Sequence, residues 1–138
     1  MLSSEQAAFV ERRRVAHLAT ADADGSPHVV PVCFAWHEGA FWIAIDEKPK
    51  RGPQLKRLRN IEENERVALI FDHYADDWSQ LGWVLVRGRA RTVGGGDAPG
   101  ALAALRSRYP QYERMALETR PLICVAPDSV RGWGDLSR

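Results

Sequence analysis

Residues 14–64, RVAHLATADADGSPHVVPVCFAWHEGAFWIAIDEKPKRGPQLKRLRNIEEN, decide the fold of this chain. They contain three short apolar runs, followed by a basic Pro/Gly loop and then by an amphipathic segment. Short apolar runs between turn residues predict β-strands, whereas apolar residues recurring every three to four positions predict a helix. The order of these parts predicts a meandering sheet with an anion-binding corner at its end.

The predicted corner is the loop EKPKRGP, residues 47–53, and the start of the helix after it. Pro53 suits the first helical position, because its fixed φ is helical and its missing N–H would have no partner there. A helix N-terminus carries unpaired N–H groups, and Lys48, Lys50 and Arg51 add full charges beside it. We therefore predict a phosphate or carboxylate site. A solvated basic loop is the alternative that local composition leaves open.

Composition limits the possible functions. The 138 residues fit a single domain, 1–138, and 19 basic against 18 acidic residues give a net charge of +1. This charge excludes the strong field of a general nucleic-acid or membrane-surface binder. Cys33 and Cys124 lie in apolar runs and are expected to be reduced, buried thiols. Because no apolar run is as long as a membrane span and no signal pattern opens the chain, we expect a cytoplasmic protein.

The rest of the chain continues the β pattern. Six strands are predicted, at 15–20, 28–36, 40–46, 66–74, 82–93 and 121–130. A first helix is predicted after the capping box of Ser3 and Gln6, with the three arginines at 12–14 extending it, and a later helix is predicted with Asp97 as its N-cap. Three surface arginines alternate with small or apolar residues in the fifth strand: Arg87, Arg89 and Arg91. Short antiparallel strands at this spacing predict a small barrel.

Five segments in this order resemble one family. They are VAHLAT (15–20), DGSPHVVPV (24–32), FWIAI (41–45), LKRLRNI (55–61) and VLVRGRA (84–90). The chain resembles the flavin-reductase-like split barrels, which include pyridoxamine 5′-phosphate oxidase and enzymes that depend on the deazaflavin coenzyme F420. The resemblance implies a mainly β fold, the FMN-binding split β-barrel with short helices, and a homodimer with the cofactor in the cleft between subunits.

The resemblance also implies a set of cofactor-binding residues. The phosphate is assigned to Lys48, Lys50 and Arg51, with Gln54 and Leu55 at the helix start and Arg59 reaching the same groove. The strand segment expected to face the ring is Val30, Pro31, Val32 and Cys33. A proline cannot donate to a strand ladder, so Pro31 indicates an edge strand, a bulge or the approach of another group.

The chain lacks the C-terminal basic motif that pyridoxamine phosphate oxidase uses for its substrate, so a vitamin B6 oxidase activity is not expected. The resemblance instead favours an F420-dependent oxidoreductase that transfers a hydride between the deazaflavin and a conjugated small molecule, with FMN as the alternative cofactor. No catalytic residue is identified, although His73 or Tyr74 could supply a proton. Tyr74 and Trp78 are candidates for the substrate pocket, and Trp83 is expected in the core.

Two other classes of function remain open at this point. The protein could bind FMN, haem or another tetrapyrrole without turnover, or it could be a cofactorless dimeric scaffold. The histidines show no metal-ligand spacing, so no metal site is predicted. Reduced-cofactor turnover would separate an enzyme from both alternatives, and a co-purifying colour would separate a binder from a scaffold.

Overall fold

A computed structural model describes residues 1–45 and 55–138, and residues 46–54 lie outside the described part. The α-helices are α1 (Ser4–Glu11), α2 (Lys56–Glu63) and α3 (Pro99–Arg108). The strands are β1 (Ala16–Ala21), β2 (Pro27–Val32), β3 (Ala35–His37), β4 (Ala40–Ala44), β5 (Arg66–His73), β6 (Gly82–Gly94) and β7 (Pro121–Gly134). Short 3₁₀ helices lie in the connections: η1 (Trp78–Gln80), η2 (Gly95–Asp97), η3 (Pro110–Arg114) and η4 (Leu117–Thr119).

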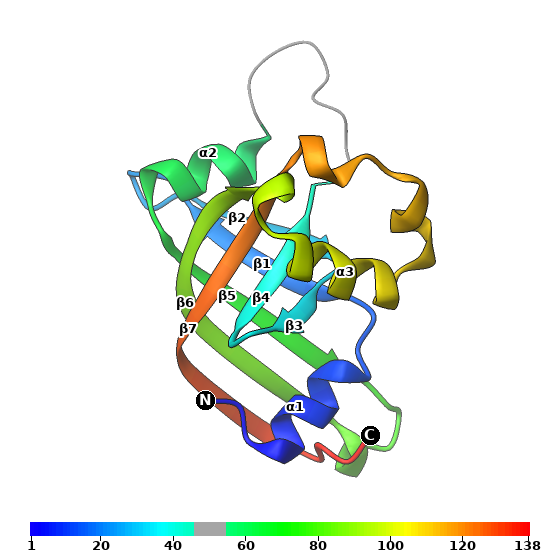
Figure 1. The fold of residues 1–138 in the computed structure, drawn as a ribbon. Coiled ribbons are helices and arrows are strands. Elements are labelled where there is room, and N and C mark those ends of the chain that lie inside the picture. The colour runs from blue at the N-terminus through cyan, green and yellow to red at the C-terminus, as the bar shows by residue number, and fades with distance from the viewer. Residues whose placement is uncertain (46–54) are drawn as a thin grey trace.

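The described strands form one antiparallel sheet of seven, in the order β2-β1-β5-β6-β7-β4-β3. β2 and β3 lie at its two edges, yet only Cys33 and Phe34 separate them in the sequence. The chain can span no more than about 11 Å between Val32 and Ala35, so the two edges must approach each other. The sheet therefore curls into a barrel (Figure 1), which confirms the predicted mainly β split barrel.

The predicted strand over 28–36 needs a correction, because the structure divides this run between β2 and β3. The run is apolar on both sides of the break, so its pattern does not mark where the chain leaves one edge of the sheet and joins the other. The position of the break is set by closure of the barrel, and it raises the number of strands from six to seven.

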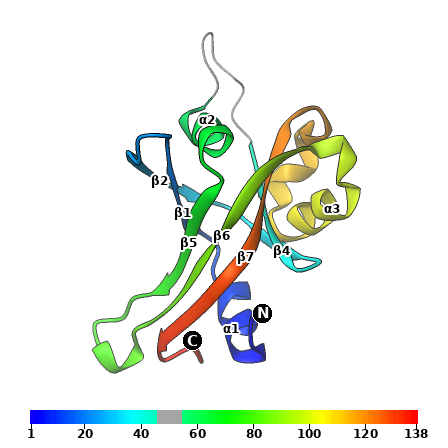
Figure 2. The same ribbon diagram turned by 90° about the vertical axis from the view of Figure 1, so that its left-hand side faces the viewer.

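Two hydrophobic cores share the sheet. The first fills the barrel and contains Phe9, Leu18, Phe34, Phe41, Leu69 and Phe71. The second lies between α3 and the outer surface of β3, β4 and β7, and contains Leu102, Leu105, Tyr109, Tyr112 and Leu122. Figure 2 shows α3 on one side of the molecule, with β1 and β5 on the opposite side. That opposite face of the sheet carries no helix among the described elements.

α1 begins with the predicted capping box. The Ser3 hydroxyl accepts a hydrogen bond of 3.1 Å from the N–H of Gln6, and the Gln6 side chain accepts one of 3.0 Å from the N–H of Ser3. The helix ends at Glu11, so its predicted extension by three arginines is wrong. Arg12 instead donates a hydrogen bond of 2.7 Å to the carbonyl of Leu136, which ties α1 to the segment after β7.

The long strand β6 confirms the predicted alternation. Its arginines are exposed and its small residues are buried, from Val86 to Arg91. Gly88 packs so closely on β7 that an added Cβ would lie 2.3 Å from the carbonyl oxygen of Ala126, and the ladder shifts register next to it. Trp83 corrects a prediction: it is only half-buried and stacks on the exposed Trp133 of β7, with ring centroids 6.2 Å apart.

Both later helices begin away from the predicted positions. α2 starts at Lys56, with Leu55 as an extended N-cap residue, and the predicted start at Pro53 lies outside the described residues. α3 starts at Pro99 after Ala98. Asp97 belongs to η2, so it is not the N-cap of α3.

Candidate cofactor-binding site

The segment predicted to face the cofactor ring lies on the edge strand β2 and its exit. Pro31 is exposed and pairs in register with His17 of β1, while Val32 is buried and Cys33 is half-buried. β2 has β1 as its single neighbour in the described sheet, so its other edge carries no ladder. The edge-strand explanation of Pro31 is therefore confirmed. Contact of 30–33 with a cofactor stays a prediction.

A pocket of about 250 Å³ opens beside this segment. It is lined by Val15, Pro31, Val32, Cys33, Ala44, Arg57 and Tyr112. The side chains come from the ends of β2 and β4, from α2, from η3 and from the residue before β1. Apolar walls with a single guanidinium suit a flat organic ligand that carries one anionic group.

α2 brings Arg57 into this pocket, and polar contacts fix the helix on the β1–β2 hairpin. Its buried Asn60 donates a hydrogen bond of 3.0 Å from Nδ2 to the hydroxyl of Thr20 on β1. Lys56 lies 3.6 Å from the carboxylate of Asp22 in the hairpin turn. The N–H of Ser26 is the main cause that lowers the pKa of Asp22, with Lys56 adding to the same shift. The acid therefore stays charged beside the helix start.

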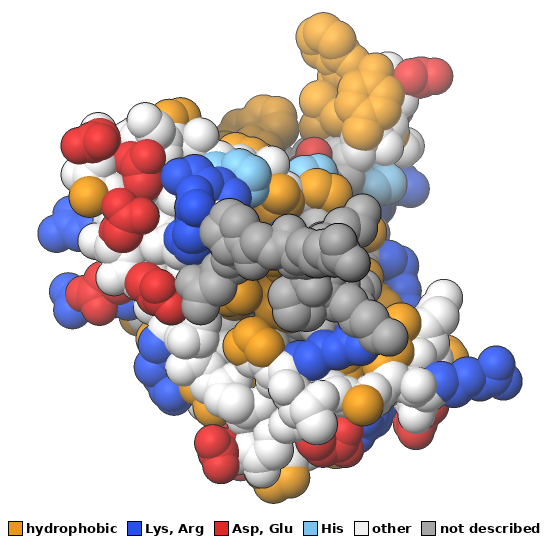
Figure 3. Space-filling view, turned by 90° about the horizontal axis from the view of Figure 1, so that it is seen from above, with side chains coloured by type: hydrophobic (Ala, Val, Ile, Leu, Met, Phe, Trp, Pro, Cys, Tyr) orange, Lys and Arg blue, Asp and Glu red, His pale blue; other side chains and the backbone are white. Residues whose placement is uncertain are grey.

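The other residues predicted to bind the cofactor are not among the described residues that line this pocket. Lys48, Lys50, Arg51 and Gln54 lie outside the described residues, so the structure leaves the predicted anion corner untested. Leu55 packs against the barrel core, as does Val30. Arg59 is half-buried on α2 but does not line the pocket, where Arg57 stands. Figure 3 looks onto this end of the barrel and shows basic and hydrophobic side chains next to one another.

The two residues predicted for the substrate pocket lie elsewhere. Tyr74 and Trp78 are 67% and 72% exposed and belong to the connection between β5 and β6. Figures 1 and 2 show this connection at the opposite end of the sheet from α2. Neither residue lines the pocket beside the segment 30–33.

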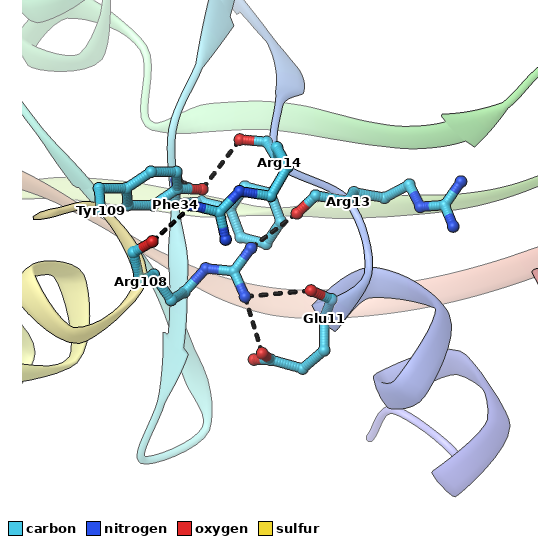
Figure 4. Close-up of polar contacts among 6 residues, drawn as sticks. All are labelled: Glu11, Arg13, Arg14, Phe34, Arg108 and Tyr109. Carbon is cyan, nitrogen blue, oxygen red and sulfur yellow. Dashed lines mark hydrogen bonds and ion pairs between the residues drawn. The ribbon is translucent and has the colours of Figure 1, made fainter.

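The crossing from β2 to β3 is held in place by the end of α3 (Figure 4). The hydroxyl of Tyr109 accepts a hydrogen bond of 3.1 Å from the N–H of Phe34 and donates one of 2.9 Å to the carbonyl of Arg14. One buried hydroxyl thus satisfies two backbone groups from separate parts of the chain. It fixes the residue that directly follows Cys33.

Arg108 completes this arrangement, which we call the α3 staple: Arg108 and Tyr109 with Glu11, Arg13, Arg14 and Phe34. The guanidinium of Arg108 donates hydrogen bonds to the carbonyl of Arg13 at 2.6 Å and to the carboxylate of Glu11 at 2.7 Å. It also lies 4.8 Å from the centroid of the Phe34 ring, within the range of a cation–π contact. Residues from α1, α3 and the crossing are thereby joined at one point.

Sequence reasoning missed Arg57, Arg108 and Tyr109. No local pattern marks Arg57, because Asn60, which fixes α2 through Thr20, falls about 100° around the helix from Ile61 and outside the stripe of Leu55, Leu58 and Ile61. No local pattern marks Arg108 and Tyr109 either, because their partners lie more than 70 positions away in the sequence.

Among the described residues, no group of three or more His, Cys, Asp or Glu side chains is placed to hold a metal ion. No described helix has the length and apolar character needed to cross a membrane.

Comparisons with known proteins agree on the fold. The conserved hypothetical protein Rv2991 of Mycobacterium tuberculosis is 24% identical, with a TM-score of 0.79 over 99% of this chain and 86% of that one. An F420 reductase is 25% identical, with a TM-score of 0.66 over 90% of this chain and 94% of that one. The heme storage protein HutZ of Vibrio cholerae is 18% identical, with a TM-score of 0.72 over 96% of this chain and 94% of that one.

No curated protein matches the sequence. The sequence model of one family, pyridoxamine 5′-phosphate oxidase, matches residues 2–134. This match covers nearly the whole chain and agrees with the split-barrel topology, so the chain belongs to the pyridoxamine 5′-phosphate oxidase family.

Proposed function

We propose that the protein is a cytoplasmic, homodimeric oxidoreductase that transfers a hydride between coenzyme F420 and a conjugated small molecule. The observation that carries the proposal is the pocket beside β2, where the exposed edge at Pro31 and the half-buried Cys33 meet the guanidinium of Arg57. A ring can lie against this edge, because Pro31 has no N–H to satisfy. Arg57 can bind an anionic group of the same ligand.

The chemistry of such an enzyme comes mainly from its cofactor. A deazaflavin supplies the hydride, so the protein needs to bind the ring, orient the substrate and exclude water. Val32 and Ala44 supply apolar walls for this purpose, and the α3 staple fixes the end of the segment that the ring would contact. The absence of a nucleophile with its base in the sequence is thus compatible with an enzyme.

The choice of F420 rests on two observations. The F420 reductase is 25% identical to this chain over most of both proteins. The predicted corner with Lys48, Lys50 and Arg51, together with Arg57, provides several cations close in sequence for an acidic cofactor. FMN is the alternative, because its single phosphate would suit the same corner.

Binding without turnover is the second candidate function. The fold likeness to a heme storage protein favours it, since a split barrel can carry haem as well as a flavin. In that case the pocket beside β2 would hold a tetrapyrrole edge, with Arg57 directed at a propionate.

A side-by-side titration of the purified protein with F420, FMN and haemin tests the proposal, with quenching of tryptophan fluorescence as the readout. We expect micromolar or tighter binding of F420 and at least tenfold weaker binding of the other two. Preference for FMN would move the protein to the flavin branch. Preference for haemin, with no oxidation of reduced F420, would favour the storage function, and binding of none of them would exclude all three.

A matched pair of variants tests the site itself. Arg57→Ala should weaken F420 binding by tenfold or more, because a charge-assisted hydrogen bond contributes about 1.5–3 kcal/mol. Arg59→Ala is the control: it removes an arginine side chain two positions further along α2, outside the pocket, and should change the affinity less than threefold. Equal effects of the two variants would show that the cofactor does not use this pocket. Replacing Lys50 and Arg51 together by Ala tests the predicted corner in the same assay.

A further inference from the structure

A second hollow lies next to the pocket beside β2. It has a volume of about 790 Å³, and we call it the arginine hollow: Arg14, Pro110, Gln111, Arg114 and Met115. Arg14 is followed directly by Val15, which lines the pocket beside β2. In the same way, Gln111 is followed by Tyr112 of that pocket. Because consecutive Cα atoms are about 3.8 Å apart, the two hollows lie side by side along two stretches of the chain.

The arginine hollow is positively charged. Arg14 and Arg114 contribute two guanidinium groups, and none of its described lining residues is acidic. The acid next in sequence, Glu113, lines a different hollow. Arg114 is exposed, and it makes no hydrogen bond or ion pair with another described residue. Its donors are therefore available to a ligand that carries a negative charge.

The guanidinium of Arg14 is held in place by the α3 staple. It donates a hydrogen bond of 2.5 Å to the carbonyl of Arg108 and lies 4.7 Å from the centroid of the Tyr109 ring (Figure 4). The hydroxyl of Tyr109 also donates to the backbone carbonyl of Arg14, so main chain and side chain are both fixed. A guanidinium has several N–H donors, so one bond to the fold leaves others for a ligand. A side chain fixed in advance loses little entropy on binding.

The boundary between the two hollows is apolar. Val15 is 45% exposed there, and Met115 lines the arginine hollow while packing against the second core. The pocket beside β2 continues with Val32 and Ala44. At about 250 Å³ it is small for a cofactor ring and a substrate together. A substrate beside the ring would therefore extend past Val15 into the arginine hollow.

We infer that the arginine hollow binds a carboxylate of the substrate, whose conjugated part lies against Val15. The inference deepens the proposed oxidoreductase, on which it rests, by naming the substrate class as a conjugated organic acid. Arg14 and Arg114 select the charge, because guanidinium groups bind carboxylates through paired, charge-assisted hydrogen bonds. Arg57 and the predicted corner remain for the anionic group of the cofactor.

Titration of the purified chain without any cofactor tests the inference, with trans-cinnamate as the probe and cinnamamide as its neutral counterpart. Two-dimensional ¹H–¹⁵N NMR spectra follow the binding, because they also locate it. We expect cinnamate to shift the amide signals of residues 14–15 and 111–115. It should bind about tenfold more tightly than cinnamamide, because the neutral amide lacks the charge that the arginines select.

Three variants test the assignment to the two arginines. Arg114→Ala should weaken cinnamate binding about tenfold, because it removes charge-assisted hydrogen bonds by changing an exposed side chain. Arg14→Ala should weaken it by a similar factor. Arg91→Ala is the matched control, since it removes an exposed arginine that lines a separate hollow, and it should change the affinity less than about twofold. Circular dichroism of each variant shows that it is folded.

Several results would overturn the inference: equal binding of cinnamate and cinnamamide, signal shifts confined to other parts of the chain, or an unchanged affinity in Arg114→Ala. Tighter binding of phenyl phosphate than of cinnamate would also overturn it, since the hollow would then select a phosphate ester. Because no cofactor is present, failure here leaves the F420 titration unaffected. Failure of the F420 titration with cinnamate bound in the arginine hollow would contradict only the proposed oxidoreductase.

Discussion

Arginines in two regions of this molecule differ in what their side chains contact. In the α3 staple, the guanidinium of Arg108 directs its donors at a backbone carbonyl and a carboxylate of other elements and lies on the ring of Phe34. On the sheet face opposite α3, Arg87 is exposed and pairs in register with Ala68, and Arg89 makes long ion pairs of 3.4 and 3.9 Å with exposed acids. No ion pair of Arg66 or Arg87 is found among the described residues.

The difference shows how one residue type can hold the fold together in one region and remain a surface group in another. A guanidinium whose donors meet carbonyls from distant segments is part of the fold, because its removal leaves those groups without partners. An exposed guanidinium keeps most of its donors in water, so it stabilises the fold little.

The largest effect is expected at the staple. Arg108→Ala should lower the free energy of unfolding by about 3 kcal/mol, because it removes charged hydrogen bonds and the cover of Phe34. Urea denaturation followed by circular dichroism measures this. Arg87→Ala on the sheet face opposite α3 is the control and should stay within about 0.5 kcal/mol. Equal losses in the two variants would abolish the distinction between the two regions.

Tyr109→Phe should have the next largest effect. The change removes one oxygen and leaves the buried N–H of Phe34 without its acceptor, at a cost of about 1–2 kcal/mol. The same denaturation experiment applies, with Tyr74→Phe as the control, because that hydroxyl belongs to a tyrosine 67% exposed. A Tyr109→Phe protein as stable as the original would mean that the staple depends on Arg108 alone.

Lowering the pH should reveal a third, smaller contribution to the stability of the fold, made by an arginine outside both regions. Arg106 donates two hydrogen bonds, of 2.8 and 2.9 Å, to the Glu118 carboxylate, and this lowers the pKa of Glu118 from 4.5 to about 2. A depressed folded-state pKa stabilises the protein above the unfolded value, and the stability is lost as pH falls from about 4.5 towards 2. Glu118→Gln should remove this part of the acid sensitivity. If the acid denaturation curves of the original protein and the Glu118→Gln variant superimpose, this prediction is wrong.

The smallest effect on folding should come from Arg66→Ala. At a protein concentration far below the dimer dissociation constant, its free energy of unfolding should lie within about 0.5 kcal/mol of the original. The low concentration matters, because a dimer interface would otherwise add to the apparent stability. A loss above about 1 kcal/mol in the monomer would place Arg66 with the arginines of the fold.

Much of the architecture could be predicted from the sequence, because strand alternation and turn residues are local signals. The strand β1, the Ser3 capping box and the alternation of β6 are all confirmed. The break at Cys33 and Phe34 could not be predicted, since barrel closure, and not any local pattern, decides where it falls. Trp83 was assigned to the core from its type, but the outward register of β6 places it on the surface.

The site could be predicted less well. Pro31 marked the edge strand correctly, because its missing N–H restricts it to a few positions in a sheet. The choice between Arg57 and Arg59 depends on the rotation of α2 about its axis, which Asn60 and Thr20 fix through a contact between distant residues. The staple depends on partners from three parts of the chain, and its residues have no distinctive spacing.

The order of the sheet has a consequence for synthesis on the ribosome. β7 lies between β6 and β4, so the hairpin of β3 and β4 has no neighbour in the sheet until residues 121–134 have been made. Until then, β4 and β6 both present unpaired edges, which other nascent chains can join. We therefore expect chains truncated before β7 to aggregate or to require a chaperone, however stable the finished barrel is.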